Sequence, residues 1–249
     1  MSLQRVFITG ASSGIGWALA EALAAPGVTL GLAARRRDRL NALVQQVAKK
    51  GGTALPYGVD VCDRDATARA VRAFAERAEG LDTVIANAGI SRSDDLRDGD
   101  ATATSELLAV NLQGTLHTLL PAVPILRAQG GGALVAIGSV AGFRGLPGKG
   151  AYCASKAALK TLMDAWRPDL RSDGIQVTTI CPGWVHSELT QQNAYRMPFI
   201  MEAPRAAQHI LRAIRAGRST YVFPWQMRLV VPLMRHVPDW MLPSLATRR

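Results

Sequence analysis

Short apolar runs alternate with longer segments of mixed polarity along most of the chain. Each run has the length of a strand, almost no charge in its interior and no polar–apolar alternation. This pattern is typical of strands that are buried on both faces of a parallel sheet. The six predicted buried strands are Arg5–Thr9, Val28–Ala33, Thr53–Val59, Leu81–Ala86, Ala133–Gly138 and Ile175–Cys181.

The segments between these runs have the length and composition of helices, which are predicted near 14–25, 36–50, 64–78, 102–128, 151–171 and 204–216. Asp63 fits the N-cap of the helix that begins at Arg64, and Gly80 and Gly130–Gly132 fit helix ends. Six repeats of strand then helix predict an α/β fold, a doubly wound parallel sheet with helices on both faces. A short strand at Ser219–Val222 is expected to bring the sheet to about seven strands.

The 249 residues suit one α/β domain of ordinary size. No linker, low-complexity tract or internal repeat indicates a second domain. We therefore expect a single domain over residues 1–222 and a C-terminal tail over 223–249. The tail contains Pro224, Pro232, Pro238 and Pro243, which argue against one long helix there.

Charge is unevenly distributed along the chain. Lys and Arg total 29 against 19 Asp and Glu, a formal net charge of +10 with a sequence pI near 10.2. Residues 190–249 contain nine arginines and two acidic residues, so they hold +7 of this charge. Single-strand nucleic-acid binding requires Lys/Arg-rich runs mixed with stacking aromatic residues, and the sequence contains no such run. We therefore expect no nucleic-acid partner, and the 48% apolar content argues against a disordered chain.

Three cysteines, Cys62, Cys153 and Cys181, are widely spaced and form no CxxC pair. We expect neither a disulfide framework nor a metal site. The N-terminus enters a predicted strand at once, so no signal peptide is expected. No apolar run approaches the ~20 residues that span a bilayer. These features predict a soluble protein of a reducing compartment, cytoplasmic by default.

The first predicted strand runs into the sequence TGASSGIG at residues 9–16, and a helix follows. Its glycines, Gly10, Gly14 and Gly16, have the spacing GxxxGxG, a variant of the dinucleotide-binding turn. Glycine lets the backbone approach a pyrophosphate closely, and the helix N-terminus offers N–H donors and a positive potential. A purely structural strand–helix turn has a similar signature. This turn opens the first strand–helix unit, however, where such sheets bind ligands.

Tyr152 and Lys156 lie four residues apart on a predicted helix and therefore share one of its faces. A free phenol has a pKa near 10, and a neighbouring cation lowers such a value by roughly 1–3 units. This pairing would make Tyr152 a proton donor or acceptor near neutral pH. Ser139 ends the fifth strand, where its hydroxyl can hold a substrate oxygen. A Tyr-x-x-x-Lys pair on its own is also typical of an ordinary helix surface.

Six motifs occur in order: TGASSGIG, Asn87-Ala88-Gly89, Asn111, Ser139, Tyr152 with Lys156, and Pro182-Gly183. In this set the chain resembles the short-chain dehydrogenase/reductase family, over nearly its whole length to about residue 222. The resemblance implies a Rossmann-like fold, an oxidoreductase acting on a carbonyl compound or its alcohol, and a nicotinamide cofactor.

By this resemblance, Tyr152 is the general acid/base, Lys156 lowers its pKa and binds the nicotinamide ribose, and Ser139 orients the reacting carbonyl or alcohol. Asn111 corresponds to the residue that holds a proton-relay water, and Asn87 to the residue that steadies the sheet near the cofactor. The implied cofactor-binding positions are Gly10, Ser12, Ser13, Gly14, Ile15, Gly16, Arg35, Arg36, Asp60, Val61, Asn87, Ala88, Gly89, Tyr152, Lys156, Pro182, Gly183, Val185 and Ser187.

Two of these positions have alternatives. Asp60 corresponds to an acid that contacts adenine, but it also fits a turn. The family commonly has a Thr after the Pro-Gly pair that touches the cofactor; here Ser187 takes that place, with Thr190 as the alternative.

The residues after the second strand indicate which nicotinamide cofactor is used. Members that prefer NAD place an acid at the end of this strand, whereas this chain has Ala34 followed by three arginines, Arg35–Arg37. Cations at a helix start oppose its macrodipole, and a 2′-phosphate would explain them through charge-assisted hydrogen bonds. An Arg-rich solvated face is the alternative. We expect NADP(H) to be preferred, with NAD(H) left open.

The segment from His186 to Pro204 falls where the family has its variable substrate lid. Its apolar residues are Tyr195, Met197, Phe199, Ile200 and Met201. They favour a lipophilic or aromatic carbonyl substrate, although simple packing of the lid on the body explains them equally well.

The resemblance implies a homodimer or homotetramer, formed through the Ala- and Leu-rich helices near 102–128 and 151–171. The basic, Trp-containing tail fits either packing on the domain or a neighbouring subunit, or peripheral contact with an anionic membrane. Two rival functions stay open: a non-catalytic NADP(H)-binding sensor and a membrane-associated, partner-binding protein on the same fold.

Overall fold

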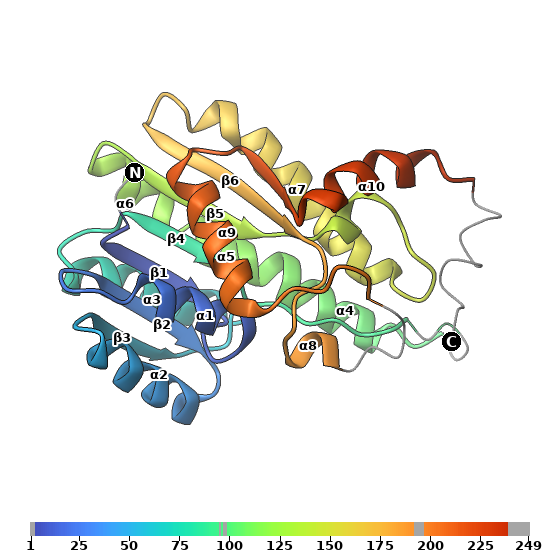
Figure 1. Cartoon of the computed structure of the whole chain (residues 1–249). Helices are drawn as coiled ribbons and strands as arrows, with labels where there is room; N and C mark the ends of the chain where they lie inside the picture. Colours follow the sequence, from blue (N-terminus) through green and yellow to red (C-terminus); the bar gives the residue numbers. More distant parts are fainter. Residues whose placement is uncertain (1–2, 95, 97–98, 192–196, 239–249) are drawn as a thin grey trace.

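Seven parallel strands form one sheet in the order β3-β2-β1-β4-β5-β6-β7 (Figure 1). The computed structural model describes residues 3–94, 96, 99–191 and 197–238. The strands are β1 (Arg5–Thr9), β2 (Thr29–Ala34), β3 (Thr53–Gly58), β4 (Thr83–Ala86), β5 (Gly132–Ile137), β6 (Ile175–Pro182) and β7 (Thr220–Phe223). All predicted strands are present with ends that differ by at most two residues, which confirms the doubly wound α/β fold.

Helices cover both faces of the sheet because successive residues of a strand point to opposite faces. The helices are α1 (Gly14–Leu23), α2 (Arg37–Lys49), α3 (Arg64–Arg77), α4 (Thr102–Leu108), α5 (Gly114–Leu119), α6 (Ala122–Ala128), α7 (Gly150–Asp169), α8 (Glu188–Gln191), α9 (Ala203–Arg215) and α10 (Trp225–His236). Val6 and Ile8 of β1 lie in the core beneath α1, α2 and α9, whereas Phe7 lies in the core beneath α3, α5, α6 and α7. As predicted, the Asp63 side chain caps α3 by accepting the Ala66 N–H at 2.9 Å.

Three local expectations are corrected. β3 is an edge strand with no fully buried residue, and Pro56 within it is a residue that edge strands tolerate. The predicted single helix over 102–128 is divided by a π-helical turn, η1 (Ala109–Gln113), and by a break at Leu120–Pro121. In the tail, α10 begins after Pro224 and runs through Pro232, so that one proline does not prevent a three-turn helix. Residues 239–249 lie outside the described part.

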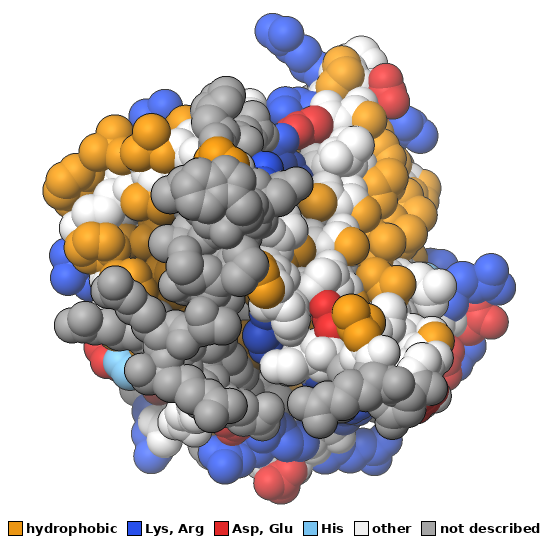
Figure 2. All heavy atoms as spheres, turned by 90° about the vertical axis from the view of Figure 1, so that its right-hand side faces the viewer, with side chains coloured by type: hydrophobic (Ala, Val, Ile, Leu, Met, Phe, Trp, Pro, Cys, Tyr) orange, Lys and Arg blue, Asp and Glu red, His pale blue; other side chains and the backbone are white. Residues whose placement is uncertain are grey.

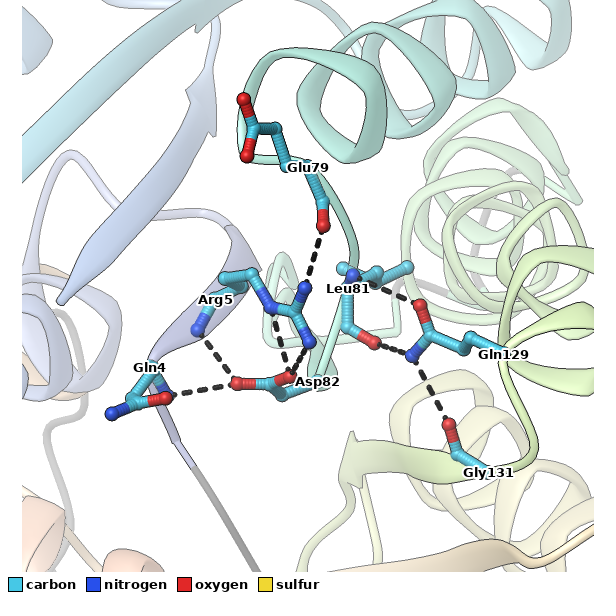
Figure 3. Close-up of polar contacts among 7 residues, drawn as sticks. All are labelled: Gln4, Arg5, Glu79, Leu81, Asp82, Gln129 and Gly131. Atoms are coloured by element: carbon cyan, nitrogen blue, oxygen red, sulfur yellow. Dashed lines mark hydrogen bonds and ion pairs between the residues drawn. The ribbon is translucent and has the colours of Figure 1, made fainter. Parts of the chain in front are cut away.

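A polar cluster ties together the amino ends of β1, β4 and β5 (Figure 3). The Arg5 guanidinium donates to Asp82 Oδ1 from Nε at 3.0 Å and from Nη2 at 2.6 Å, and the Arg5 and Gln4 N–H groups donate to Oδ2. Gln129 in turn bonds the backbone of Leu81. Burial opposes the charged form of Asp82, but the bonds from Arg5 and Gln4 outweigh it and lower the carboxyl pKa.

A hollow of about 360 Å³ lies beside this cluster, at the opposite edge of the sheet from the predicted site residues. The polar side chains that line it already have partners: Arg5 bonds Asp82, and Gln129 bonds the backbone of Leu81 and Gly131. We therefore interpret this hollow as a structural feature and not as a binding site.

Candidate active site

The glycine turn after β1 is locked to the turn after β4, at the point where the strand order reverses between β1 and β4. Gly10 has a φ of +66°, and a Cβ there would lie 2.8 Å from Ala88 Cα. A Cβ on Gly16 would lie 2.3 Å from the Gly10 carbonyl oxygen. Asn87 Nδ2 donates to the carbonyl oxygens of Thr9 at 3.0 Å and Gly10 at 3.2 Å. Only glycine permits this approach, so these positions build the rigid floor of the site.

The amino end of α1 is free to hold an anion. Ser13 occupies the N-cap but makes no side-chain capping bond, and the first turn, which includes Gly14 and Ile15, contains no acidic residue. The first N–H groups of a helix have no partner within the helix, and they attract phosphate groups together with the macrodipole. The residues present therefore fit a pyrophosphate at this turn.

Arg36 links the glycine turn to the segment after β6. Its Nε and Nη2 donate to Ser12 Oγ at 3.2 and 3.1 Å, and its Nη1 donates to Glu188 Oε2 at 2.8 Å. Ser12 is buried, whereas Arg36 and Glu188 are about half exposed. Arg35 lies apart from this contact, with Nη1 3.7 Å from Asp60 Oδ2. The two arginines thus flank the end of β2, where Ala34 provides no acid.

Asp60 and Val61 follow β3 and shape the turn before α3. Asp60 Oδ1 accepts the Cys62 N–H at 3.0 Å, so part of its carboxylate closes a turn, one of the two roles anticipated for it. Val61 is buried, and its carbonyl oxygen lies 2.8 Å from His117 Nδ1. Whether either residue contacts adenine stays a prediction.

Lys156 is the buried charge at the centre of the site. Its side chain donates from Nζ to the Ile137 carbonyl oxygen at 2.9 Å, and a Cβ on Gly89 would lie 3.6 Å from Nζ. Burial lowers the pKa of this lysine to about 8. An ammonium group taken out of water in this way requires an anionic or polar partner, and the Ile137 carbonyl oxygen at the end of β5 provides one.

Tyr152 lies beside this lysine, and Ser139 follows the strand whose Ile137 carbonyl oxygen accepts the Lys156 bond. Lys156 Nζ is 5.8 Å from the centroid of the Tyr152 ring, because both side chains project from neighbouring turns of α7. Ser139 directly follows β5, and its Oγ accepts the Ala141 N–H at 3.1 Å at the start of η2 (Val140–Phe143), a 3₁₀-helix. The buried Cys181 lies close by, and burial raises the pKa of its thiol to about 12. That thiol is therefore protonated and unreactive at neutral pH.

Asn111 lies in the π-helical turn η1 and is fully buried. Its Oδ1 accepts the Ile90 N–H at 2.8 Å, and its Nδ2 donates to the Ile90 carbonyl oxygen at 2.9 Å and to Ser155 Oγ at 3.3 Å. Ser155 donates to the Tyr152 carbonyl oxygen at 2.7 Å. Asn111 therefore connects the segment after β4 to the helix of Tyr152, and π-bulges are frequent at functional sites. Its predicted role in holding a water stays a prediction.

The end of β6 closes the other side of the site. Gly183 donates its N–H to the Phe223 carbonyl oxygen at 2.7 Å, directly after Pro182. Val185 is buried and pairs with Met201. A Cβ on Gly14 would lie 3.1 Å from Ser187 Cβ, so Ser187 faces the glycine turn. Thr190, the alternative position, uses its hydroxyl to bond Val185 and Ser187.

Two residues that sequence reasoning did not single out contribute to the site. Asp94 accepts the N–H groups of Gly150 and Ala151 and so caps the first turn of α7, the turn that contains Tyr152. Glu188 is the partner of Arg36 described above. Both contacts join residues more than 50 positions apart, which no local pattern reveals.

Part of the predicted lid lies outside the described residues, namely 192–196 with Tyr195. Of the remainder, Met201 is buried and Phe199 is 51% exposed with a φ of +60°. No group of His, Cys, Asp and Glu in the described part is arranged to hold a metal ion. Among the described helices, none is both long and apolar enough to cross a bilayer.

Comparison with known proteins relates this chain to one family along most of its length. The sequence profile described as "short chain dehydrogenase" matches residues 4–197. An uncharacterized oxidoreductase of Myxococcus xanthus is 39% identical over 248 residues, covering 100% of this chain and 98% of the relative. An uncharacterized oxidoreductase of Mycobacterium tuberculosis is 35% identical over 250 residues, covering 99% and 96%.

Solved structures agree with this relationship. A short-chain type dehydrogenase/reductase from Mycobacterium marinum superposes with a TM-score of 0.82 at 26% identity, covering 89% of this chain and 94% of the other. A 3-ketoacyl-ACP reductase from Sinorhizobium meliloti gives 0.80 at 30% identity, covering 90% and 99%. Fold and relatives together define an α/β oxidoreductase. The chain belongs to the short-chain dehydrogenase/reductase family.

Proposed function

We propose that this protein is an NADP(H)-dependent oxidoreductase that interconverts a lipophilic or aromatic ketone or aldehyde and its alcohol. The observation on which the proposal rests is the buried Lys156, which lies beside Gly89 and next to the Tyr152 ring. A sensor that only binds a nucleotide has no need of a buried ammonium paired with a phenol and a nearby hydroxyl. The membership of an oxidoreductase family supports the same conclusion.

The proton is handled by Tyr152. In carbonyl reduction its hydroxyl donates the proton to the substrate oxygen, and in alcohol oxidation its phenolate accepts that proton. Lys156 stabilises the phenolate by its positive charge, and the Ile137 carbonyl fixes the ammonium in place. In this proposal Ser139, which follows β5, donates a hydrogen bond to the substrate oxygen and holds it near Tyr152. A nicotinamide bound at this site supplies or accepts the hydride.

Residues from the carboxyl ends of three strands would hold the cofactor. The free amino end of α1 suits the pyrophosphate, Lys156 the nicotinamide ribose, and Arg35 and Arg36 the 2′-phosphate of NADP(H). The preference for NADP(H) over NAD(H) is supported by the pair of arginines and by the absence of an acid at Ala34. Arg36 already makes two hydrogen bonds to Ser12, which hold the guanidinium over the turn.

The substrate class is supported by the apolar residues that follow β6. Val185 and Met201 form a buried pair that joins the two ends of the lid segment, and Phe199 is half exposed. A carbonyl substrate is also consistent with the name of the Sinorhizobium neighbour, a ketoacyl reductase. We further propose a homodimer or homotetramer built on the helices between 102 and 128 and on α7, and no nucleic-acid partner.

The proposal is tested by following NADPH and NADH oxidation with a panel of ketones and aldehydes of graded hydrophobicity. We expect turnover with lipophilic or aromatic members and a higher kcat/KM for NADPH than for NADH. The variant Arg35→Ala with Arg36→Ala should lose that preference, while Arg69→Ala with Arg72→Ala, an equal charge change on α3, should keep it. Equal or better turnover with NADH in the unaltered protein contradicts the cofactor assignment. Tight NADPH binding without turnover of any carbonyl compound indicates a sensor instead.

A further inference from the structure

The helix α10 has two apolar faces, and only one of them is buried. Met227 and Val231 on its inner face are 3% and 8% exposed. Trp225, Leu229 and Leu233 on its outer face are 65%, 62% and 68% exposed. These three residues are spaced four apart and form one stripe along the helix. Single exposed apolar residues are ordinary on a protein surface, but a continuous stripe of large ones marks a surface that another molecule covers.

The body of the protein holds this helix in a fixed orientation. Arg228 Nε donates to the Val222 carbonyl oxygen at 3.0 Å, and the guanidinium lies 4.9 Å from the centroid of the Tyr221 ring. At the other end, Arg144 Nη2 donates to the Val237 carbonyl oxygen at 3.0 Å. The inner face packs on Gly183, where a Cβ would lie 3.2 Å from Met227 Cγ. The outer stripe is therefore displayed by the fold rather than by a frayed terminus.

Arginines of α9 and α10 gather around His209, next to the strand that leads into α10. From Ala203 to Pro238 the sequence contains six arginines and no acidic residue. The pKa of His209 is lowered first by its burial and then by the positive charges of three exposed neighbours, Arg212, Arg205 and Arg228. Within the described part of the chain, Arg205, Arg212 and Arg228 form no ion pair with a carboxylate. An apolar helical stripe beside unpaired arginines is the pattern of helices that lie in the headgroup region of anionic membranes.

We propose that the outer face of α10 docks on an anionic lipid surface. A second copy of the chain is the other candidate occupant, and charge argues against it. A two-fold interface brings the same patch of both copies together, so the arginines of one copy would face those of the other. In addition, a stable dimer interface buries roughly 800 Å² on each partner, whereas a stripe of three side chains on a helix of about 18 Å offers less. Anionic headgroups instead neutralise the arginines while the acyl region accepts the apolar stripe.

This docking would turn the catalytic edge of the sheet toward the membrane. The inner face of α10 lies on Gly183 and against η2, the elements that follow β6 and Ser139. Figure 2 looks onto the side of the molecule on which α10 lies in Figure 1, and it shows hydrophobic side chains gathered at its left and at its right, with Lys and Arg side chains at several points of the rim. The inference stands on the surface of α10 and does not depend on the proposed reaction.

The test is flotation of the full-length protein with phosphatidylcholine vesicles, with and without an equal part of phosphatidylglycerol. We expect binding to the anionic vesicles only. Leu229→Gln with Leu233→Gln, which removes apolar area without adding charge, should abolish it. Arg205→Gln with Arg212→Gln should weaken binding several-fold, whereas Arg69→Gln with Arg72→Gln, the same charge change on the opposite face of the sheet, should bind like the unaltered protein.

Circular dichroism and thermal unfolding establish that each variant is folded. Absence of binding to anionic vesicles, or binding that survives the two leucine substitutions, overturns the proposal. If the unaltered protein instead forms a dimer in analytical ultracentrifugation that the leucine variant dissociates, and vesicles are not bound, the face belongs to a second copy. NADPH oxidation with a water-soluble aldehyde, measured on the same samples, reports separately on the reaction.

Discussion

Arg36 Nη1 lies 2.8 Å from Glu188 Oε2, so the arginine proposed to take the 2′-phosphate is already paired with a carboxylate from the lid segment. A phosphate that reaches Arg36 must compete with that carboxylate or lie beside it. In the proposed function, Glu188 would thus oppose NADP(H) binding through both competition and repulsion. The pair would also couple the position of α8 to the binding of a 2′-phosphate.

We predict that Glu188→Gln lowers the Kd for NADPH by about two- to fivefold, because an exposed ion pair contributes up to about 1 kcal/mol. The Kd for NADH should stay unchanged. Fluorescence titration with both cofactors measures this. Glu202→Gln is the matched control, since it removes a carboxylate of the same segment that lies near His186 rather than Arg36. A parallel change in both cofactors, or none in either, contradicts a role for Glu188 in cofactor choice.

Lys156 is kept at a cost to the stability of the free protein. Its pKa of about 8 lies below the unfolded value near 10.4. The unfolded chain therefore binds the proton more tightly than the folded protein does. Burial of Lys156 lowers the free energy of unfolding by its full amount below pH 8, and this loss disappears as pH rises toward 10.4. We predict that Lys156→Met unfolds at higher urea concentration than the unaltered protein at pH 7, by about 2 kcal/mol, after allowance for the lost bond to Ile137.

The excess in the free energy of unfolding of Lys156→Met over the unaltered protein should shrink between pH 8 and 10. The variant should be inactive. Urea unfolding of the cofactor-free proteins at pH 7 and 9.5 tests the sign. A variant that is less stable at pH 7, with a difference that does not vary with pH, would show that the ammonium group is not destabilised by burial.

Asp94 positions the catalytic helix from a distant part of the chain. Its carboxylate accepts the first N–H groups of α7, and replacing an N-cap by Ala costs about 1 kcal/mol. We predict that Asp94→Ala lowers kcat about tenfold with little change in the KM for NADPH, because Tyr152 lies in the first turn of α7. Asp94→Asn, a good capping residue, should retain most of the activity.

The control for Asp94 is Asp63→Ala, which removes the capping side chain of another helix, α3, where the cap is the residue directly before the helix. It should lower stability by a similar amount and leave kcat at saturating NADPH nearly unchanged. If both alanine variants lose the same stability and neither loses turnover, the Asp94 contact is a structural cap only.

At the amino edge of the sheet, Asp82 supports the fold without touching the site. Its lowered pKa means that its contribution is complete above the unfolded value near 3.9 and is lost as pH falls through the folded value. We predict that Asp82→Asn destabilises the protein by about 2 kcal/mol at pH 7 and leaves kcat and KM unchanged. Asp173→Asn, which breaks an exposed pair with Arg127, should change stability little. A large loss of kcat in Asp82→Asn at a temperature where it is folded would contradict the separation of the two edges.

The parts of the fold that sequence predicted are those with local causes. Uninterrupted apolar runs located the strands, the cap at Asp63 located the start of α3, and the glycine spacing located the turn after β1. β3 was expected to be buried because an apolar run does not reveal how many neighbours the strand has; Pro56 was the signal that it lies at an edge. The division of the helix at Asn111 depends on bonds to Ile90, 21 residues away, which periodicity cannot show.

The candidate site shows the same difference between features with local causes and features that depend on distant residues. Residues within one motif, such as Tyr152 and Lys156, were found because their spacing on a helix is itself the signal. Asp94 and Glu188 were missed because each acts on a partner that only the folded sheet brings near. The outer stripe of α10 was likewise hidden, since prolines in the tail argued against the helix that displays it.

The central claim is that Tyr152 transfers the proton in a carbonyl reduction. The most direct measurement compares Tyr152→Phe with the unaltered protein in steady-state NADPH oxidation, alongside NADPH binding. Tyr221→Phe, which removes a hydroxyl that bonds His209, is the matched control. We predict that Tyr152→Phe lowers kcat by at least about 100-fold while the Kd for NADPH stays unchanged and the control stays active. Turnover by Tyr152→Phe at a rate close to that of the unaltered protein would contradict the assignment.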